Sequence, residues 1–267
     1  MSSPYSNPSN REAGFHRRVD SIDWYYELSG KGPTVVLIPS GEGDCGSFEK
    51  VAASLSRQFT VLTFDMPGFS RSSDPPDFSN YSMGRAAREV AGLVQALELG
   101  PATFYGCSSG AHDALTLAAE HPALVRNVAI HEIPLSVRGD LGAWTTLGDD
   151  GIVRACQALF RNQMNESVEA WDGLGEAYHK RLERNYVTWV RRYVGQPQIF
   201  RQFVPEELRR RPVTWTIGGL SPAFMFFDNV LTAQAAGIPI GLLMCKHFPQ
   251  VSIPDALADH IGTVARG

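Results

Sequence analysis

The chain lacks the features that mark membrane, secreted and metal-binding proteins. None of its apolar runs is long enough to span a bilayer, and residues 1–13 are polar without a signal-peptide core. The cysteines form no C-x-x-C pair and no Cys/His cluster with zinc spacing. They are Cys45, Cys107, Cys156 and Cys245. We therefore expect a cytoplasmic protein with reduced thiols, a flexible tail over residues 1–13 and no membrane partner.

The excess of one sign of charge over the other is also small. The net charge is −4, and the strongest basic run, Arg209-Arg210-Arg211, ends at Pro212. Binding to a phosphate backbone requires a much larger basic cluster, so we expect no nucleic-acid partner. No internal repeat is visible in the sequence. The oligomeric state is left open, and a homodimer is compatible with the sequence.

The residues that are present alternate between strand and helix patterns. One strand with alternating polarity is expected over Ile22–Leu28, and short apolar runs predict further strands buried on both faces. These runs cover Thr34–Pro39, Phe59–Phe64, Ala102–Tyr105, Val125–His131, Val213–Gly218 and Ile238–Met244. Helices are expected between them, over Ser47–Arg57, Met83–Leu97, a run through Glu120, and residues 223–236. The alternation predicts an α/β fold with a mostly parallel, doubly wound sheet.

One long segment interrupts this alternation. Residues 135–212 read as helical throughout and contain no buried strand. We interpret this segment as an inserted helical cap, with residues 14–134 and 213–267 forming the core domain. Its aromatic residues recur every three or four positions from Trp171 through Tyr186 and Trp189 to Tyr193. Such a stripe packs the cap onto the core and is also suited to a bulky, flat, apolar ligand.

The sharpest motif is Gly106-Cys107-Ser108-Ser109-Gly110, which follows an expected strand and opens an expected helix. This context is that of a nucleophile elbow, in which a tight turn exposes the central residue and small neighbours avoid a backbone clash. We therefore expect Ser108 to be the nucleophile. Cys107 precedes the exposed position and is expected to be buried as a small apolar residue.

A serine hydroxyl needs a histidine to take its proton. In α/β hydrolases the order along the chain is nucleophile, acid, histidine, so the base should come late and follow a strand. His247 meets both conditions. His260 is also late, but it falls in an expected C-terminal helix beside Asp255 and Asp259. We expect His247 to be the base.

The acid that orients the histidine has two candidates. Glu132 comes directly after the expected strand Val125–His131, and the carboxyl ends of parallel strands converge on one site. Asp228 follows the strand after the cap but falls inside the next expected helix. Glu132 is therefore the preferred candidate and Asp228 the reserve.

Two backbone N–H groups should bind the oxyanion that forms during acyl transfer. One is that of Ser109, and the other should come from the loop that contains Gly41. This loop also holds the main rival interpretation. Gly41, Gly43 and Gly46 match the dinucleotide fingerprint G-x-G-x-x-G, with Asp65 at the end of the next strand. A dinucleotide-binding dehydrogenase would leave the elbow and the late histidine unexplained.

Several segments together resemble the fungal zearalenone lactonases. The resemblance extends from about Ile22 to the last helix and includes VVLIPSGEGDCGSF, TFDMPGFSRS, GCSSGA, HEIP and GLLMCKHFPQVS. Asp65 then belongs to a structural turn of the hydrolase fold. The resemblance implies a Ser-Glu-His triad of Ser108, Glu132 and His247, an oxyanion hole at Gly41 and Ser109, and no metal or cofactor. It also implies a macrocyclic resorcylic lactone as substrate, with Trp189 contacting it from the cap.

Further substrate contacts are expected from both domains. We place Tyr193, Leu159, Phe160, Pro134 and Phe248 among the substrate-binding residues. The chain departs from the family at Ser40, Glu42 and Lys246. These departures leave open whether zearalenone, a zearalenol or another lactone or ester is preferred. A small-molecule receptor on the same fold is the alternative of a different class, and sustained turnover would distinguish the two.

Overall fold

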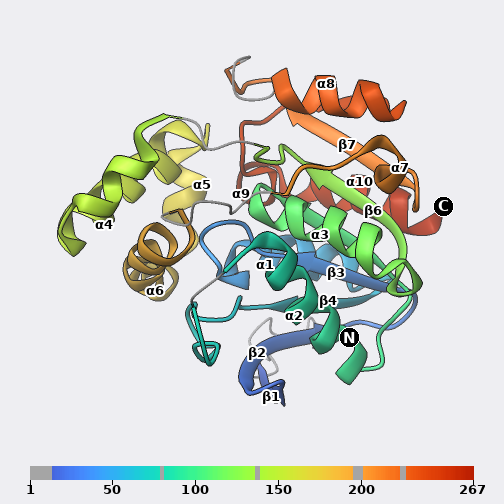
Figure 1. The fold of residues 1–267 in the computed structure, drawn as a ribbon, viewed down its shortest axis with the longest axis horizontal. Helices are drawn as coiled ribbons and strands as arrows, with labels where there is room; N and C mark the ends of the chain where they lie inside the picture. The colour runs from blue at the N-terminus through green and yellow to red at the C-terminus, as the bar shows by residue number, and fades with distance from the viewer. Residues whose placement is uncertain (1–13, 79–80, 136–138, 195–200, 223–226) are drawn as a thin grey trace, which may run out of the picture.

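The computed structural model describes residues 14–78, 81–135, 139–194, 201–222 and 227–267. The expected tail over residues 1–13 and the first part of the expected helix at 223–236 lie outside them. An eight-stranded sheet runs through the molecule in the order β1-β2-β4-β3-β5-β6-β7-β8 (Figure 1). The strands are β1 (Phe15–Val19), β2 (Ile22–Ser29), β3 (Thr34–Ile38), β4 (Thr60–Phe64), β5 (Ala102–Cys107), β6 (Val125–His131), β7 (Val213–Gly218) and β8 (Ile240–Leu243). From β4 to β8 all neighbouring strands are parallel, whereas β1 and β2 add an antiparallel edge.

Helices cover both faces of the sheet. α1 (Glu49–Leu55) and α10 (Pro254–Arg266) pack on each other at one face, and α2 (Met83–Ala96) and α3 (Ser109–Glu120) do so at the other. Successive residues of β3 point into different cores, since Val35 belongs to the hydrophobic cluster with α1 and α10, and Val36 to that with α2 and α3. Burial on both faces explains why the strand sequences are continuously apolar. The predicted doubly wound α/β sheet is confirmed.

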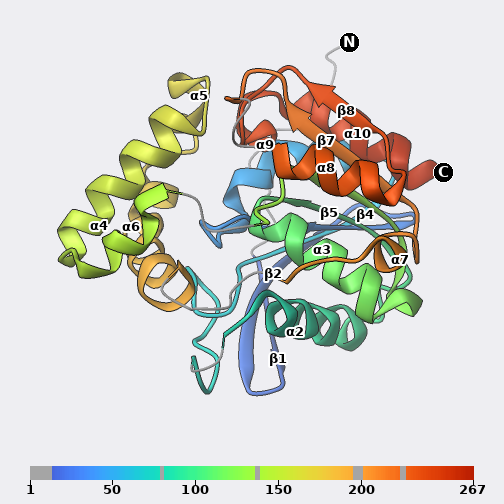
Figure 2. The ribbon, with the colours of Figure 1, turned by 45° about the horizontal axis from the view of Figure 1, so that its top comes forward.

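The segment between β6 and β7 is helical in the residues that the structure describes. It contains η3 (Gly139–Thr146), α4 (Asp149–Gln157), η4 (Ala158–Gln163), α5 (Val168–Asp172), α6 (Glu176–Thr188), η5 (Trp189–Val194) and α7 (Pro205–Leu208). Figures 1 and 2 show α4, α5 and α6 standing together at one side of the sheet. α7 instead packs on α3 and on α8 (Phe227–Ala236). The domain boundaries at 135 and 212 stay a prediction.

The sequence pattern did not predict β1. Its residues are mostly exposed, so they carry no apolar periodicity. β1 exists because it pairs with β2 through a two-residue turn in which Asp20 and Ser21 both have positive φ, at 47° and 70°. Positive φ at both central positions is typical of a hairpin turn, although glycine or asparagine is its usual sequence marker.

A buried carboxylate joins α6 to the loop after β3. Asp44 is fully buried and accepts hydrogen bonds from Arg181 of α6 at 2.6 and 3.0 Å and from the Ser70 hydroxyl at 2.6 Å. Burial alone would raise the pKa of Asp44, but the bonds from Arg181 and Ser70 hold it below its ordinary value. Asp44 is therefore ionised, and its charge is balanced across the contact between α6 and the core.

Asn185, also buried on α6, completes this contact. Its amide group donates to the backbone carbonyl of Glu42 at 2.8 Å and to the hydroxyl of Ser70 at 2.7 Å. Its side-chain oxygen accepts from the Ser70 backbone N–H at 2.9 Å. We call Asp44, Ser70, Arg181 and Asn185 the α6 clamp. The clamp fixes the loop that follows β3 directly to α6.

Removing Arg181 should weaken the fold more than removing an exposed arginine. Arg181→Met leaves Asp44 with a buried charge and only Arg71, at 3.5 Å, as a cationic neighbour. We expect the free energy of unfolding in guanidinium to fall by about 2–3 kcal/mol. Arg161→Met removes an exposed pair with Asp172 and should leave the free energy of unfolding almost unchanged. Equal losses in the two variants would contradict the clamp.

Candidate active site

Ser108 sits at the strained turn between β5 and α3. Its φ and ψ are 57° and −125°, a conformation that side chains rarely adopt, and its backbone N–H donates to the carbonyl of His131 at 3.0 Å. Glycines make the turn possible. A Cβ atom on Gly106 would lie 2.0 Å from the carbonyl oxygen of Gly110, and one on Gly110 would lie 2.5 Å from that of Ile38. The sequence motif thus folds into the turn expected for a nucleophile elbow.

Glu132 and His247 meet at the carboxyl edge of the sheet, where Glu132 directly follows β6 and His247 lies in the loop after β8. Glu132 Oε2 is 2.6 Å from His247 Nδ1, and both side chains are buried. The second carboxylate oxygen, Oε1, accepts the backbone N–H of Gly218 at 2.8 Å. Glu132 has a positive φ of 45°, and its own N–H bonds to Thr216 in β7, so the strain is held by the sheet. This geometry fixes the His247 ring, with Nδ1 occupied and Nε2 left for another partner.

The environment of Glu132 favours its ionised form. Burial raises the pKa of this carboxyl group, but the hydrogen bond and charge of His247 outweigh burial and lower the pKa to about 2. A carboxylate that stays ionised can stabilise a protonated imidazole, which is what the acid of a triad must do.

Other acidic and histidine candidates occupy different places. Asp228 lies in the first turn of α8, and the carboxylate that bonds to His247 is Glu132. His131 is fully buried between Thr216 Oγ1, at 3.0 Å, and the carbonyl oxygen of Lys246, at 3.1 Å. Burial lowers the pKa of His131 to about 4, so it is neutral at pH 7 and supports the loop of His247. His260 is in α10, as expected.

The loop after β3 lies against the elbow and under the helices between β6 and β7. A Cβ atom on Gly110 would meet the carbonyls of both Ile38 and Pro39, which shows how closely the two segments approach. At Gly41 a Cβ atom would lie 2.8 Å from the indole nitrogen of Trp189. Gly41 therefore provides room for the Trp189 ring, which no other residue type would leave.

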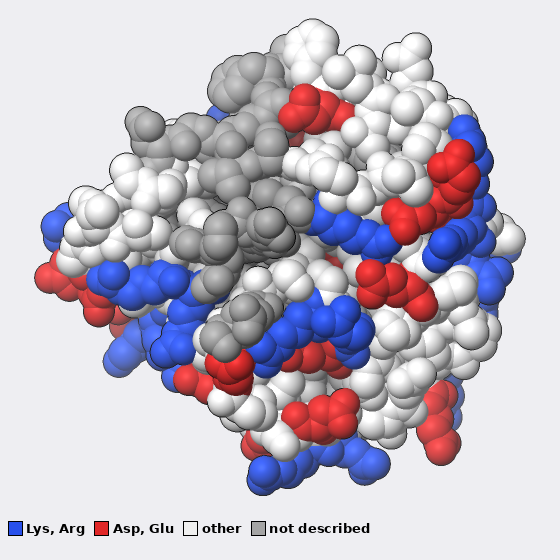
Figure 3. Space-filling view, viewed as in Figure 1, with Lys and Arg blue, Asp and Glu red and all other residues white. Residues whose placement is uncertain are grey.

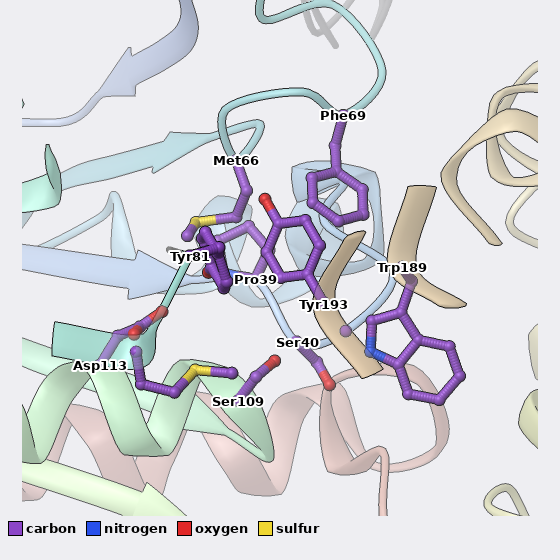
Figure 4. Close-up of a pocket in the computed structure, with 11 residues that line it drawn as sticks. Pro39, Ser40, Met66, Phe69, Tyr81, Ser109, Asp113, Trp189 and Tyr193 are labelled. Atoms are coloured by element: carbon purple, nitrogen blue, oxygen red, sulfur yellow. The ribbon is translucent and has the colours of Figure 1, made fainter. Parts of the chain in front are cut away.

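A pocket opens beside Ser109, and the non-atom space in it is about 290 Å³ when the open solvent at its mouth is included. Figure 4 shows Ser109 and Asp113 on one wall, with Trp189 and Tyr193 across from them. The lining residues are Pro39, Ser40, Gly41, Met66, Phe69, Tyr81, Met83, Ser109, Asp113, Trp189 and Tyr193. Six of the eleven lining residues are aromatic or methionine, and Ser40, Ser109 and Asp113 add polar groups. Such a lining suits an apolar ligand with a small number of oxygen atoms.

The sequence-predicted substrate residues divide into two groups. Trp189 and Tyr193 line the pocket, as do the two predicted oxyanion residues, Gly41 and Ser109, whereas the other four predicted substrate residues are absent from its lining. Phe160 and Phe248 are buried, and their rings stack on each other with centroids 5.5 Å apart. Leu159 and Pro134 are partly buried. A substrate contact for Leu159, Phe160, Pro134 and Phe248 stays a prediction.

Sequence reasoning missed the pocket wall formed by Met66, Phe69, Tyr81 and Met83, and it missed Asp113. One signal was present for Asp113. Ser109 and Asp113 are four positions apart in one helix, so they share a face. An acidic residue on the ligand-facing side of the elbow helix is unusual in an otherwise apolar wall, and it is discussed further below.

No group of His, Cys, Asp and Glu in the part of the chain that the structure describes could hold a metal ion. The four cysteines are buried and unpaired. Within the same residues, no helix is long and apolar enough to cross a membrane. On the face shown in Figure 3, acidic and basic side chains are interspersed rather than separated by sign.

This fold and this site define an α/β hydrolase. A family model for the alpha/beta hydrolase fold matches residues 33–200. Among solved structures, the enol-lactonase from Burkholderia xenovorans superposes with a TM-score of 0.75 at 20% identity, over 94% of this chain and 100% of that one. At this identity the likeness establishes the fold alone.

Relatives with higher sequence identity define the family more narrowly. A zearalenone hydrolase from Bionectria ochroleuca is 39% identical over 249 residues, covering 91% of this chain and 93% of the relative. One from Cladophialophora bantiana is also 39% identical, covering 92% and 94%. The chain belongs to the zearalenone hydrolase family of α/β hydrolases, and it is an enzyme. The predicted family and fold are both confirmed.

The ionised state of Glu132 should appear in the pH dependence of stability. The folded-state pKa of about 2 lies below the ordinary value of 4.5. The carboxylate therefore stabilises the fold above about pH 4.5, and this contribution is lost as pH falls toward 2. Glu132→Gln should reduce the free energy of unfolding by on the order of 2 kcal/mol at pH 7 and by much less at pH 3.

Denaturant titrations of both proteins at pH 7, 5 and 3 measure this difference. Glu183→Gln, an exposed change on α6, is the control and should stay within about 0.5 kcal/mol of wild type. A difference between Glu132→Gln and wild type that stays constant, or grows, on acidification would rule out a depressed pKa.

Proposed function

We propose that this protein is a serine hydrolase that opens the ester bond of a macrocyclic resorcylic lactone such as zearalenone or a zearalenol. The observation that carries the proposal is the 2.6 Å bond between His247 and Glu132, next to the strained elbow of Ser108. The two relatives at 39% identity, both zearalenone hydrolases, support the substrate class.

In the proposed reaction, Ser108 Oγ attacks the ester carbonyl while His247 Nε2 takes its proton. Nε2 is assigned this role because Nδ1 is already bonded to Glu132. The ionised Glu132 then stabilises the imidazolium that forms. His247 returns the proton to the departing oxygen, which opens the ring and leaves the acyl group on Ser108.

The negative charge on the tetrahedral intermediate is assigned to two backbone donors. Ser109 is the first residue of α3, where N–H groups have no acceptor within the helix. Gly41 lines the same pocket from the loop after β3. Donors fixed before the reaction need no reorganisation as the charge develops, which is the main source of rate in such sites.

Water completes the cycle. His247 removes a proton from a water molecule, which attacks the acyl-enzyme and releases the carboxylic acid and free Ser108. The released acid is expected to lose carbon dioxide spontaneously. Trp189, across the pocket from Ser109, is positioned to stack on the aromatic ring of the substrate.

Incubation with excess zearalenone and no added cofactor tests the proposal directly. We expect many turnovers to a ring-opened, decarboxylated product, seen by chromatography and mass spectrometry. Ser108→Ala should lower the rate at least about 1000-fold, because the nucleophile is lost, while the unfolding midpoint stays close to that of wild type. A Ser108→Ala variant with substantial activity would refute the mechanism.

Cys107→Ala is the matched control at the neighbouring position. The thiol is fully buried, and burial raises the pKa of Cys107 well above its ordinary value, so it is not a nucleophile. This variant should keep activity within about tenfold of wild type. Binding of zearalenone without turnover would instead indicate a receptor, and hydrolysis of simple aryl esters alone would indicate another ester as substrate.

A further inference from the structure

Asp113 is a buried acid in the wall of the pocket. It lies on α3, four residues after Ser109, so the two are separated by about one helical turn, roughly 5–6 Å along the axis. Only 1% of Asp113 is exposed. Figure 4 shows its carboxyl group on the side of the pocket where Tyr81 and Met66 lie. Asp113 is therefore more buried than Gly41 and Ser109, which are partly exposed.

One oxygen of this carboxyl group has no partner. Asp113 Oδ1 is buried and makes no hydrogen bond to the residues that the structure describes. The hydroxyl of Tyr193, which lines the same pocket, donates to the carbonyl of Pro67 at 2.9 Å instead. Buried polar atoms in folded proteins almost always have a partner, so an unpartnered oxygen on a side chain that lines a pocket points to a group that the ligand supplies.

The surroundings of Asp113 favour its neutral form. Burial, with a smaller effect from the charge of Glu89, raises the pKa of Asp113 well above its ordinary value. The neighbouring pocket side chains, Tyr81, Met83 and Tyr193, carry no positive charge that could balance a carboxylate. A neutral carboxylic acid has an O–H group to donate and an oxygen with which to accept.

We propose that Asp113 is a specificity-determining residue whose carboxyl group hydrogen-bonds an uncharged oxygen, a carbonyl or hydroxyl, on the ligand about one helical turn from the scissile ester. The inference rests on the proposed ester hydrolysis at Ser108 and adds a second recognition point to it. A ligand that bears such an oxygen satisfies both groups, whereas a hydrocarbon ligand leaves the acid unpaired in an apolar wall. A site that binds a polar group in this way discriminates strongly against analogues that lack it.

A matched pair of esters tests this without zearalenone. Phenyl 6-oxoheptanoate carries a ketone about five bonds from its ester carbonyl, and phenyl heptanoate does not. We expect the wild-type enzyme to prefer the keto ester by about tenfold in kcat/KM. Asp113→Val, which removes the donor, should reduce this preference to about one. Asp113→Asn, which keeps a neutral donor of the same shape, should retain most of it.

Two controls separate specificity from folding and from chemistry. The readout is the ratio of the two kcat/KM values within each variant, because a change that affects both esters equally leaves this ratio unchanged. Asp113→Val should melt at the wild-type temperature or above it, because it replaces an unpaired polar group with an apolar one. A large drop in its melting temperature would show that the carboxyl group serves the fold and would overturn the inference.

The remaining outcomes are equally distinct. No preference for the keto ester in wild type, or an unchanged preference in Asp113→Val, would refute the role of Asp113. A stronger preference for phenyl 6-aminohexanoate would also refute it, because it would require an ionised Asp113 that binds a cation. If the keto ester is preferred but zearalenone is not hydrolysed, the proposed substrate fails and the Asp113 subsite stands. Hydrolysis of none of these esters would overturn the proposed function itself.

Discussion

The tight turn between β5 and α3 is the constraint on which the rest of the site depends. Gly106 and Gly110 cross so closely that a single methyl group on either would collide with backbone. Their approach forces Ser108 into its strained conformation and sets where α3 begins. The start of α3 in turn places the Ser109 N–H beside the loop after β3 and directs Asp113 into the pocket. Strain at one residue thereby orients the groups proposed for attack, charge stabilisation and recognition.

Two buried carboxyl groups within this site have opposite protonation states. Burial raises the pKa of both Glu132 and Asp113. Glu132 has His247 and the Gly218 N–H as partners, and these outweigh burial, so it is ionised. Asp113 has no such partner among the described residues for Oδ1, so burial dominates. The difference follows from the hydrogen bonds and charges that each carboxyl group meets, and it supplies the proposed mechanism with an anion beside His247 and a neutral acid in the pocket wall.

Local sequence patterns predicted the fold and the positions of Ser108, Glu132 and His247 because strand ends in a parallel sheet meet at one edge. They predicted neither the α6 clamp nor Asp113, since contacts between distant segments leave no local periodicity. The aromatic stripe from Trp171 to Tyr193 illustrates the limit of prediction from local sequence patterns. Trp171 and Tyr186 pack in a core cluster, while Trp189 and Tyr193 reach the pocket. Helical spacing identifies a face, but the wider π-helical turn η5 changes what that face meets.

The α6 clamp also bears on how this family can diversify. The inserted caps of hydrolases resemble modules that recombination or protein engineering can exchange as units. Here Asp44 and Ser70 lie outside the helices between β6 and β7, yet they supply half of the polar contact that holds α6. Transplanted to another core, these helices would arrive without Asp44 and Ser70, and a foreign cap placed on this core would leave the buried Asp44 without Arg181, with Arg71 at 3.5 Å as its neighbour. The segments that must be exchanged together are therefore not contiguous in the sequence. They are the cap and the loops around residues 44 and 70, and successful chimeras should carry all three segments from one parent.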